Sequence, residues 1–168
     1  MMYRVIKMIY EYALDIDAEL KYAQRWALGR NPAFYDFEPT GGDCTNFVSQ
    51  CIYAGGAAMN YTPDYGWYYI SPDGRAAAWS GVEYFFRFMT TNKGVGPFGE
   101  QIGLSQVQTG DVVQLGNDRG FYHSLFVLSA KNGIRIAAHS YDAYGKPLSD
   151  YDFDQARCIH IIGSRKML

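Results

Sequence analysis

Residues 41–56 read GGDCTNFVSQCIYAGG, and the rest of the chain can be understood as serving this stretch. Apolar side chains recur in it at the spacing of one helix face, which predicts a short helix with one buried side: Phe47, Val48, Cys51 and Ile52. Asp43 or Thr45 can cap the start of this helix, and the glycines at 55–56 can end it. Cys44 is therefore expected in or just before the first turn, where free N–H groups and the positive end of the helix dipole lower the pKa of a thiol. A nucleophilic cysteine needs that environment.

The composition is that of one globular domain, which we place at residues 1–168. Hydrophobic residues make up 48% of the 168, enough to form a sizeable core. The net charge of −2 gives no electrostatic reason to expect a nucleic-acid partner. No apolar run is long enough to cross a membrane, and Met1–Ile9 lacks the continuous apolar core of a signal peptide. These features leave two locations open, the cell interior and export by another route.

The three cysteines, at 44, 51 and 158, do not form a disulfide or zinc framework. No C-x-x-C pair is present. Cys44 and Cys51 lie about two helical turns apart on one face, which is too far for a disulfide. Cys51 and Cys158 sit in apolar surroundings and are expected to be small core residues. Cys44 is then the one candidate nucleophile.

The order of helix and strand signals predicts an α+β fold, with N-terminal helices packed on one face of an antiparallel sheet. Besides the quoted stretch, helices are expected at 18–28 and, from the capping box Ser80-x-x-Glu83, to about Met89. Strands are expected at 112–115, 122–130, 134–139 and 158–163, with a hairpin turn at Asn132-Gly133. Residues 92–99 are expected to be loop, and the long aromatic segment 57–78 to be one wall of a cleft.

A nucleophilic cysteine needs a base, and the chain has three histidines. His123 begins the second strand directly after a turn, from where its side chain can project toward a neighbouring helix start. A cysteine paired with a histidine makes a thiolate–imidazolium nucleophile, and a third group usually orients the base. His160 in the last strand, Asp111 in a turn and Asp43 beside the thiol are expected to be structural.

The register of the hairpin decides which residue orients His123. With a three-residue loop at 131–133, His139 falls opposite Leu125 and becomes a diagonal neighbour of His123 on the same face. With a two-residue loop at 132–133, His139 moves to the opposite face and Asp142 falls opposite His123. The residues themselves leave both registers open.

The quoted stretch, together with Tyr22-Ala23, Asn31-Pro32-x-x-Tyr35, Gly110-Asp111, Tyr122-His123-Ser124 and His139-Ser140, resembles the bacterial putative amidase domain family. That family looks like a branch of the papain-like NlpC and CHAP cell-wall hydrolases, and the likeness runs from about residue 18 to residue 162. It implies a papain-like fold and hydrolysis of amide bonds in peptides, such as peptidoglycan stem peptides. It also implies no cofactor or metal.

The resemblance further implies roles for single residues. Cys44 would be the nucleophile, His123 the base and His139 the third polar residue, with Asp142 as the alternative orienter. Tyr35 is the candidate side-chain donor of the oxyanion hole beside the N–H of Cys44, by analogy with a tyrosine of the NlpC-type enzymes, and Asn31 is a weaker choice.

Two other functions compete with a cysteine amidase. One is a metal-dependent hydrolase with Cys44, His123 and His139 as ligands, although their spacing matches no compact zinc motif. The other is a non-catalytic module of the same fold that binds peptides or glycans through its aromatic side chains. The oligomeric state is not indicated by the sequence.

Overall fold

The computed structural model describes residues 8–168. Most of the segment Met1–Ile9, which is predicted not to be a signal peptide, lies outside that range. Four α-helices occur in it: α1 (Ile16–Trp26), α2 (Cys44–Ala54), α3 (Ala77–Ser80) and α4 (Val82–Thr91). The strands are β1 (Ile9–Tyr12), β2 (Gly96–Ile102), β3 (Val112–Asn117), β4 (Gly120–Ser129), β5 (Arg135–Ala138), β6 (Ala143–Pro147) and β7 (Gln155–Met167). Three short 3₁₀ turns, Glu38–Thr40, Leu104–Gln106 and Leu148–Asp150, complete the described elements.

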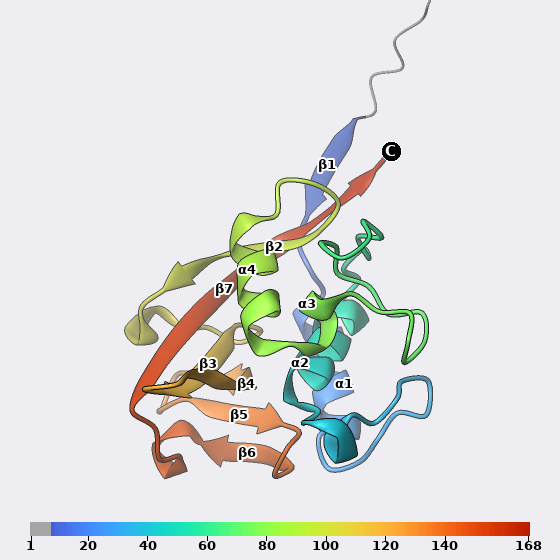
Figure 1. The fold of residues 1–168 in the computed structure, drawn as a ribbon. Coiled ribbons are helices and arrows are strands. Elements are labelled where there is room, and N and C mark those ends of the chain that lie inside the picture. Colours follow the sequence, from blue (N-terminus) through green and yellow to red (C-terminus); the bar gives the residue numbers. More distant parts are fainter. Residues whose placement is uncertain (1–7) are drawn as a thin grey trace, which may run out of the picture.

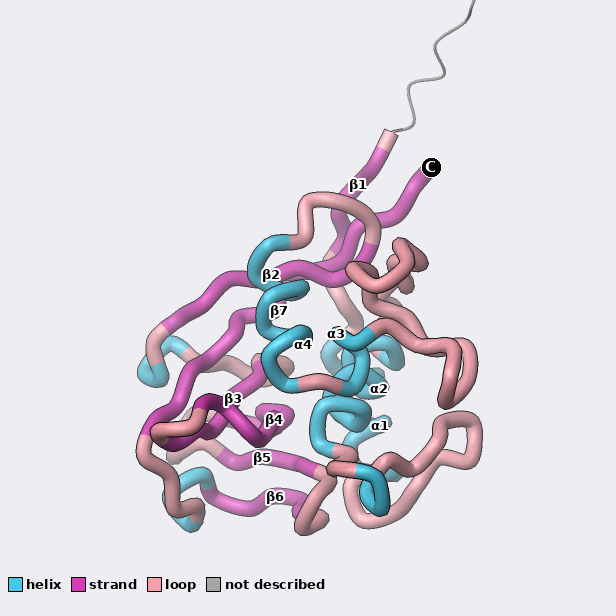
Figure 2. Tube along the Cα trace, in the orientation of Figure 1, coloured by secondary structure: helices cyan, strands magenta, loops and turns pink. Residues whose placement is uncertain are grey.

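The strands form one antiparallel sheet in the order β1-β7-β3-β4-β5-β6, and β2 pairs with the other edge of β7. The helices gather on one side of this sheet, with α2 among them (Figure 1). A helical group packed on an antiparallel sheet is an α+β fold, so that prediction is confirmed. The long loop between α2 and α3 runs beside the helices (Figure 2).

Apolar side chains cover both faces of the sheet. On the helix side, Phe126 and Ala137 pack with Phe47 and Val48 of α2 in the larger core. On the far side, residues of β3, β4, β5 and β7 form a second core with Leu148. Helix α2 is buried from Cys44 to Ile52, more completely than one apolar stripe predicts, because polar residues of that helix also bond inward.

Most predicted elements are present, and the differences have local causes. The segment 92–99 is wrong as a loop, since β2 begins at Gly96 and pairs with β7. The capping box is also wrong: Gly81 is the N-cap of α4, and the hydroxyl of Ser80 accepts a hydrogen bond from Arg75 instead. Strands β1 and β6 were not predicted. Short and irregular strands such as these give weak signals of alternation.

The two structural cysteines are where the sequence predicts. Cys51 and Cys158 are buried and unbridged, and so is Cys44. His160 bonds the carboxylate of Asp111 at 2.8 Å, which confirms a structural contact for both residues.

Glu19 of α1 is an unexpected member of the interior. Its side chain has no exposure, and its two carboxyl oxygens have no hydrogen-bond partner among the residues described. The side chain fits because residues 55 and 110 are glycines. A Cβ at Gly55 would lie 2.6 Å from one Glu19 carboxyl oxygen, and a Cβ at Gly110 would lie 3.1 Å from the other. Burial, followed by the charges of Asp111 and Asp15, raises the pKa of Glu19 from 4.5 to about 9. The carboxyl group is therefore protonated at neutral pH.

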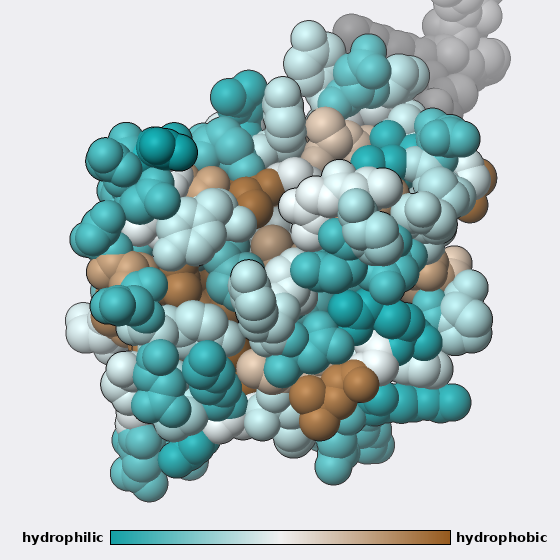
Figure 3. Space-filling view, turned by 60° about the horizontal axis from the view of Figure 1, so that its bottom comes forward, coloured by the Kyte–Doolittle hydropathy of each residue, from teal (hydrophilic) through white to brown (hydrophobic). Residues whose placement is uncertain are grey.

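The surface seen from the lower end of Figure 1 is mainly hydrophilic, with apolar side chains in small separate groups (Figure 3). Within residues 8–168, no helix combines the length and the apolar character needed to span a membrane.

Candidate active site

Cys44 occupies the first position of α2. The helix begins there because Asp43 accepts the first helical hydrogen bond, from the N–H of Phe47 to its carbonyl. The neighbouring Thr45 hydroxyl lies 2.9 Å from the Ser124 hydroxyl and ties the helix start to β4. Sγ of Cys44 lies 3.8 Å from the Thr45 hydroxyl. The thiol is thus placed against the strand that carries His123.

The surroundings of Cys44 disfavour its thiolate form. Burial raises the pKa of Cys44 above its ordinary value of 9.0, and the charge of Asp43 adds to the rise. The backbone N–H of Ser124 and the groups of Thr45 act in the opposite direction but do not cancel it. The prediction that the helix start lowers the thiol pKa is therefore wrong, because the cost of burying a thiolate exceeds the dipole's benefit.

His123 lies on β4 and is only 8% exposed. Burial lowers its pKa from 6.5 to about 4; the carboxylate of Glu38 opposes this change and the ammonium of Lys146 adds to it. The imidazole is therefore neutral at neutral pH and can accept a proton. Its ring lies 6.0 Å from the ring of Tyr151.

Cys44 and His123 line the same pocket, of about 350 Å³. The other lining residues come from the loop before α2, from β3 and β4, and from the segments after β5 and β6: Glu38, Gly41, Gly42, Leu115, Tyr122, Ser140, Tyr141 and Tyr151. Within residues 8–168 no hydrogen bond joins the Cys44 thiol to the His123 ring. The pair is neutral and unbonded, and catalytic hydrogen bonds are often long in an unliganded enzyme.

The turn after β5 shapes one wall of this pocket. Ser140 and Tyr141 both have left-handed backbones, with φ of 60° and 66°, which is costly for residues with a side chain. The Ser140 hydroxyl accepts from the N–H of Asp43 at 3.0 Å and donates to the Glu38 carboxylate at 2.7 Å. One hydroxyl thus holds Glu38 at the pocket and fixes the residue before Cys44.

His139 does not contact His123. Its Nδ1 bonds the carboxylate of Asp43 at 2.5 Å and its Nε2 bonds the carbonyl of Trp26 at 2.8 Å. These two contacts occupy both ring nitrogens. The ring also stacks on Phe47, with centroids 4.3 Å apart. His139 therefore holds the start of α2, with neither nitrogen free to receive a bond from His123 or a metal ion.

The position of His139 follows from a third register that neither hairpin alternative contains. Ser129 pairs with Arg135, as the three-residue loop requires, but a bulge then shifts the pairing so that Val127 faces Ile136 and Phe126 faces Ala137. Continued by two residues, this register places His139 opposite Ser124. His139 thus lies on the helix side of the sheet rather than on the side of His123.

Asp142 and Tyr35 also lie apart from His123. Asp142 forms a bidentate ion pair with Arg30, at 2.8 and 3.1 Å. Tyr35 is not a lining residue of the Cys44 pocket; its ring packs on Phe37 and its backbone N–H bonds the hydroxyl of Tyr69. The side chain of Asn31 bonds within its own loop and to α1.

Asp43 has the structural role expected of it: it is the N-cap residue of α2, but its side chain caps no N–H of the helix. Its Oδ1 accepts from the N–H of Phe37 at 2.9 Å and from the side-chain amide of Asn46 at 2.8 Å. No sequence signal marks Glu38 or Tyr151, which reach the pocket only through tertiary packing.

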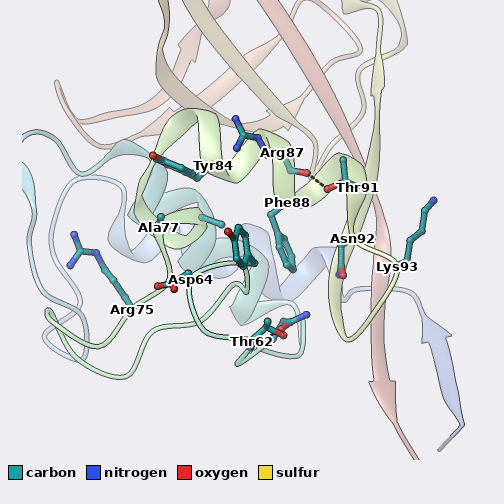
Figure 4. Close-up of a pocket in the computed structure, with 13 residues that line it drawn as sticks. Thr62, Asp64, Arg75, Ala77, Tyr84, Arg87, Phe88, Thr91, Asn92 and Lys93 are labelled. Carbon is teal, nitrogen blue, oxygen red and sulfur yellow. Dashed lines mark hydrogen bonds between the residues drawn. The ribbon is translucent and has the colours of Figure 1, made fainter.

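A larger hollow, of about 840 Å³, lies between α4 and the loop before α3 (Figure 4). Residues of the predicted cleft wall at 57–78, among them Thr62, Asp64 and Arg75, line it together with α4. The segment is thus a cleft wall as predicted, but of a hollow that contains no cysteine or histidine. The smaller pocket is the better candidate for catalysis because it alone of the two holds a nucleophile and a base.

Comparisons with known proteins relate this chain to a family and to a curated protein. The family model described as "Putative amidase domain" matches residues 13–162. The uncharacterized protein YhbB of Bacillus subtilis (strain 168) is 28% identical over 130 residues, which cover 74% of this chain and 40% of that protein. The chain therefore spans well under half the length of this curated relative. No solved structure matches the chain.

Proposed function

The chain belongs to the putative amidase domain family, and from this membership we propose that it hydrolyses amide bonds with Cys44 as nucleophile and His123 as base. The family supports an amidase-type hydrolase. The cysteine mechanism rests on one observation: the first residue of α2 and a histidine of β4 line the same pocket. A papain-like arrangement, in the manner of the NlpC and CHAP enzymes, is part of the proposal.

The reaction begins from a neutral pair. Sγ of Cys44 attacks the carbonyl carbon as its proton passes to the His123 ring, which a pKa of about 4 leaves free to accept it. The N–H of Cys44 belongs to the first turn, where N–H groups have no intrahelical partner, and it can donate to the developing oxyanion. The imidazolium then protonates the leaving amine, the C–N bond breaks and a thioester forms.

Water completes the cycle. The neutral His123 removes a proton from a water molecule that attacks the thioester carbonyl. The C–S bond breaks, the imidazolium returns its proton to Sγ, and the acid product leaves. His139 acts in this scheme as a positioning residue, because its bond to Asp43 fixes the entry to α2.

The proposed substrate is a peptide amide, with peptidoglycan stem peptides as the leading class. A pocket of about 350 Å³ suits one amino-acid-sized group at the scissile bond. The extent of the catalytic domain, residues 1–168, stays a prediction.

The test is mass-spectrometric product analysis after incubation with purified peptidoglycan and with synthetic peptides. Wild type should release new amine and acid ends, while Cys44→Ala and His123→Gln should release none. The matched control is His160→Gln, which removes a sheet histidine outside the pocket and should keep activity.

Three results would contradict the proposal. Full activity in Cys44→Ala rules out the thiol nucleophile, and loss of activity with a chelator but not with iodoacetamide points to the metal-dependent alternative. Binding of an uncleaved peptide, with Cys44 unreactive on long incubation, indicates the non-catalytic binding module.

A further inference from the structure

The group that orients His123 is missing from the predicted set. His139 uses both ring nitrogens elsewhere, and Asp142 is held by Arg30. A catalytic imidazole needs a partner for the N–H that does not face the nucleophile, and this partner matters most when the ring is charged. The partner should therefore be sought among the other residues of the Cys44 pocket.

Tyr151 is the residue of that pocket with an unused polar group. Its hydroxyl is shielded from solvent and has no hydrogen-bond partner among the residues described. Native proteins rarely leave such a group unpaired, because the desolvation penalty is not repaid. Its ring lies 6.0 Å from the ring of His123, tilted by 50°, and both residues line the same pocket.

The neighbouring residues hold Tyr151 in place. They also leave its uncharged hydroxyl oxygen as a free hydrogen-bond acceptor for the N–H of His123. The ammonium of Lys146 lies 4.1 Å from the Tyr151 ring centroid, a cation–π contact that fixes the ring. The same positive charge opposes protonation of His123, while the carboxylate of Glu38, a lining residue of the pocket, favours it. Glu38 already accepts a bond from Ser140, whereas the Tyr151 oxygen accepts none.

We propose that Tyr151 is a positioning residue for His123: its hydroxyl oxygen accepts a hydrogen bond from the protonated imidazole that forms when Cys44 gives up its proton. The resting structure lacks this bond. The N–H that donates it is already present on the neutral ring, and the bond becomes stronger when the ring is charged. It therefore stabilises the charged intermediate more than the resting enzyme, which is the condition for lowering a barrier. This inference rests on the proposed function, but its main measurement does not need a substrate.

The test compares Tyr151→Phe with wild type and with Tyr144→Phe, an exposed tyrosine of the neighbouring strand β6. The His123 ring is titrated by NMR from acid to neutral pH, with its signals assigned by their absence in His123→Gln. Loss of one hydrogen bond to a charged group should lower the His123 pKa by about one pH unit in Tyr151→Phe and leave Tyr144→Phe unchanged.

Two further measurements separate a positioning role from a structural one. Alkylation of Cys44 by iodoacetamide at neutral pH should slow about tenfold in Tyr151→Phe, because the thiolate–imidazolium form becomes rarer. The urea midpoint should stay equal or rise, since the change removes an unpaired buried hydroxyl.

An unchanged His123 titration and alkylation rate overturn the inference, even if amide hydrolysis falls, because Tyr151 then acts on the substrate. If wild type hydrolyses no amide but the titration shifts as expected, the proposed function fails while the link between Tyr151 and His123 stands.

Discussion

Replacing Glu19 with Gln should make the protein more stable at neutral pH and leave it equally stable in acid. Glu19 is fully buried, with a pKa of about 9 in the fold against an ordinary value of 4.5. The unfolded chain releases this proton above pH 4.5, whereas the folded protein retains it up to about pH 9. Between these values the folded state binds more protons, so the free energy of unfolding falls as pH rises.

The magnitude follows from the same two values. From pH 4.5 to pH 7, at about 1.4 kcal/mol per pH unit, the buried carboxyl lowers the free energy of unfolding by about 3 kcal/mol. Glu19→Gln keeps the shape of the side chain and has no proton to lose. We therefore expect it to be more stable than wild type by about 3 kcal/mol at pH 7, by more at pH 9, and by almost nothing at pH 4.

Urea denaturation of both proteins at these pH values, followed by circular dichroism, measures the effect. The slope with urea should be the same for the two proteins, so that the midpoints compare directly. Asp17→Asn, which changes an exposed carboxylate on the same helix, should show no comparable gain at any pH. A stability difference between Glu19→Gln and wild type that does not change with pH would refute the argument, because it would mean that Glu19 does not titrate as its burial requires.

The other predictions concern the site and the sheet. The value of kcat/KM should rise with pH around an apparent pKa near 4, where His123 loses its proton. It should fall only above pH 9, where Cys44 loses its proton. A fall below about pH 8 would indicate a thiolate–imidazolium resting pair instead. His139→Leu should lower the free energy of unfolding by about 3 kcal/mol in urea denaturation, because Oδ2 of the buried Asp43 carboxylate loses its bond to His139 and keeps only Arg30 at 3.6 Å. A loss below about 1 kcal/mol would show that the contact between His139 and Asp43 contributes little to stability. Gly99→Ala should cost about 2 kcal/mol in the same assay, since its Cβ would lie 2.2 Å from a backbone oxygen of β7, and an unchanged midpoint would mean that β2 can move away.

The sequence predicts α2 well because its signals are local. The glycine pairs and the helical spacing of Phe47 and Cys51 lie within one short stretch, and the helix ends at Ala54 as they indicate. The environment of Cys44 could not be predicted in the same way, because the thiol pKa depends on burial against β4. Burial is a tertiary property, and here it outweighs the local effect of the helix start.

The orienting group shows a second limit. Both hairpin alternatives assumed an unbroken ladder, but a bulge between Val127 and Ser129 shifts the register that the three-residue loop starts. His139 therefore lies on the face opposite His123, as the two-residue loop predicts, although the residue pairing is that of neither alternative. A bulge adds one residue without any composition signal in this segment, and it moves all later side chains to the other face. Tyr151 could not be predicted for a different reason. It follows β6, a strand whose sequence lacks the alternation of apolar and polar residues.

The pairing of β7 has a consequence for synthesis on the ribosome. This strand alone joins β1 and β2 to β3 and the rest of the sheet. Until residues 155–167 have left the exit tunnel, β3 lacks its partner on that side and the first strands have none in the sheet. The nascent chain can form its helices early, but it must hold the edge of β3 unpaired until translation of β7 is finished. The sheet is thus completed only after β7 has emerged, and chaperones that bind exposed strand edges would act in that interval.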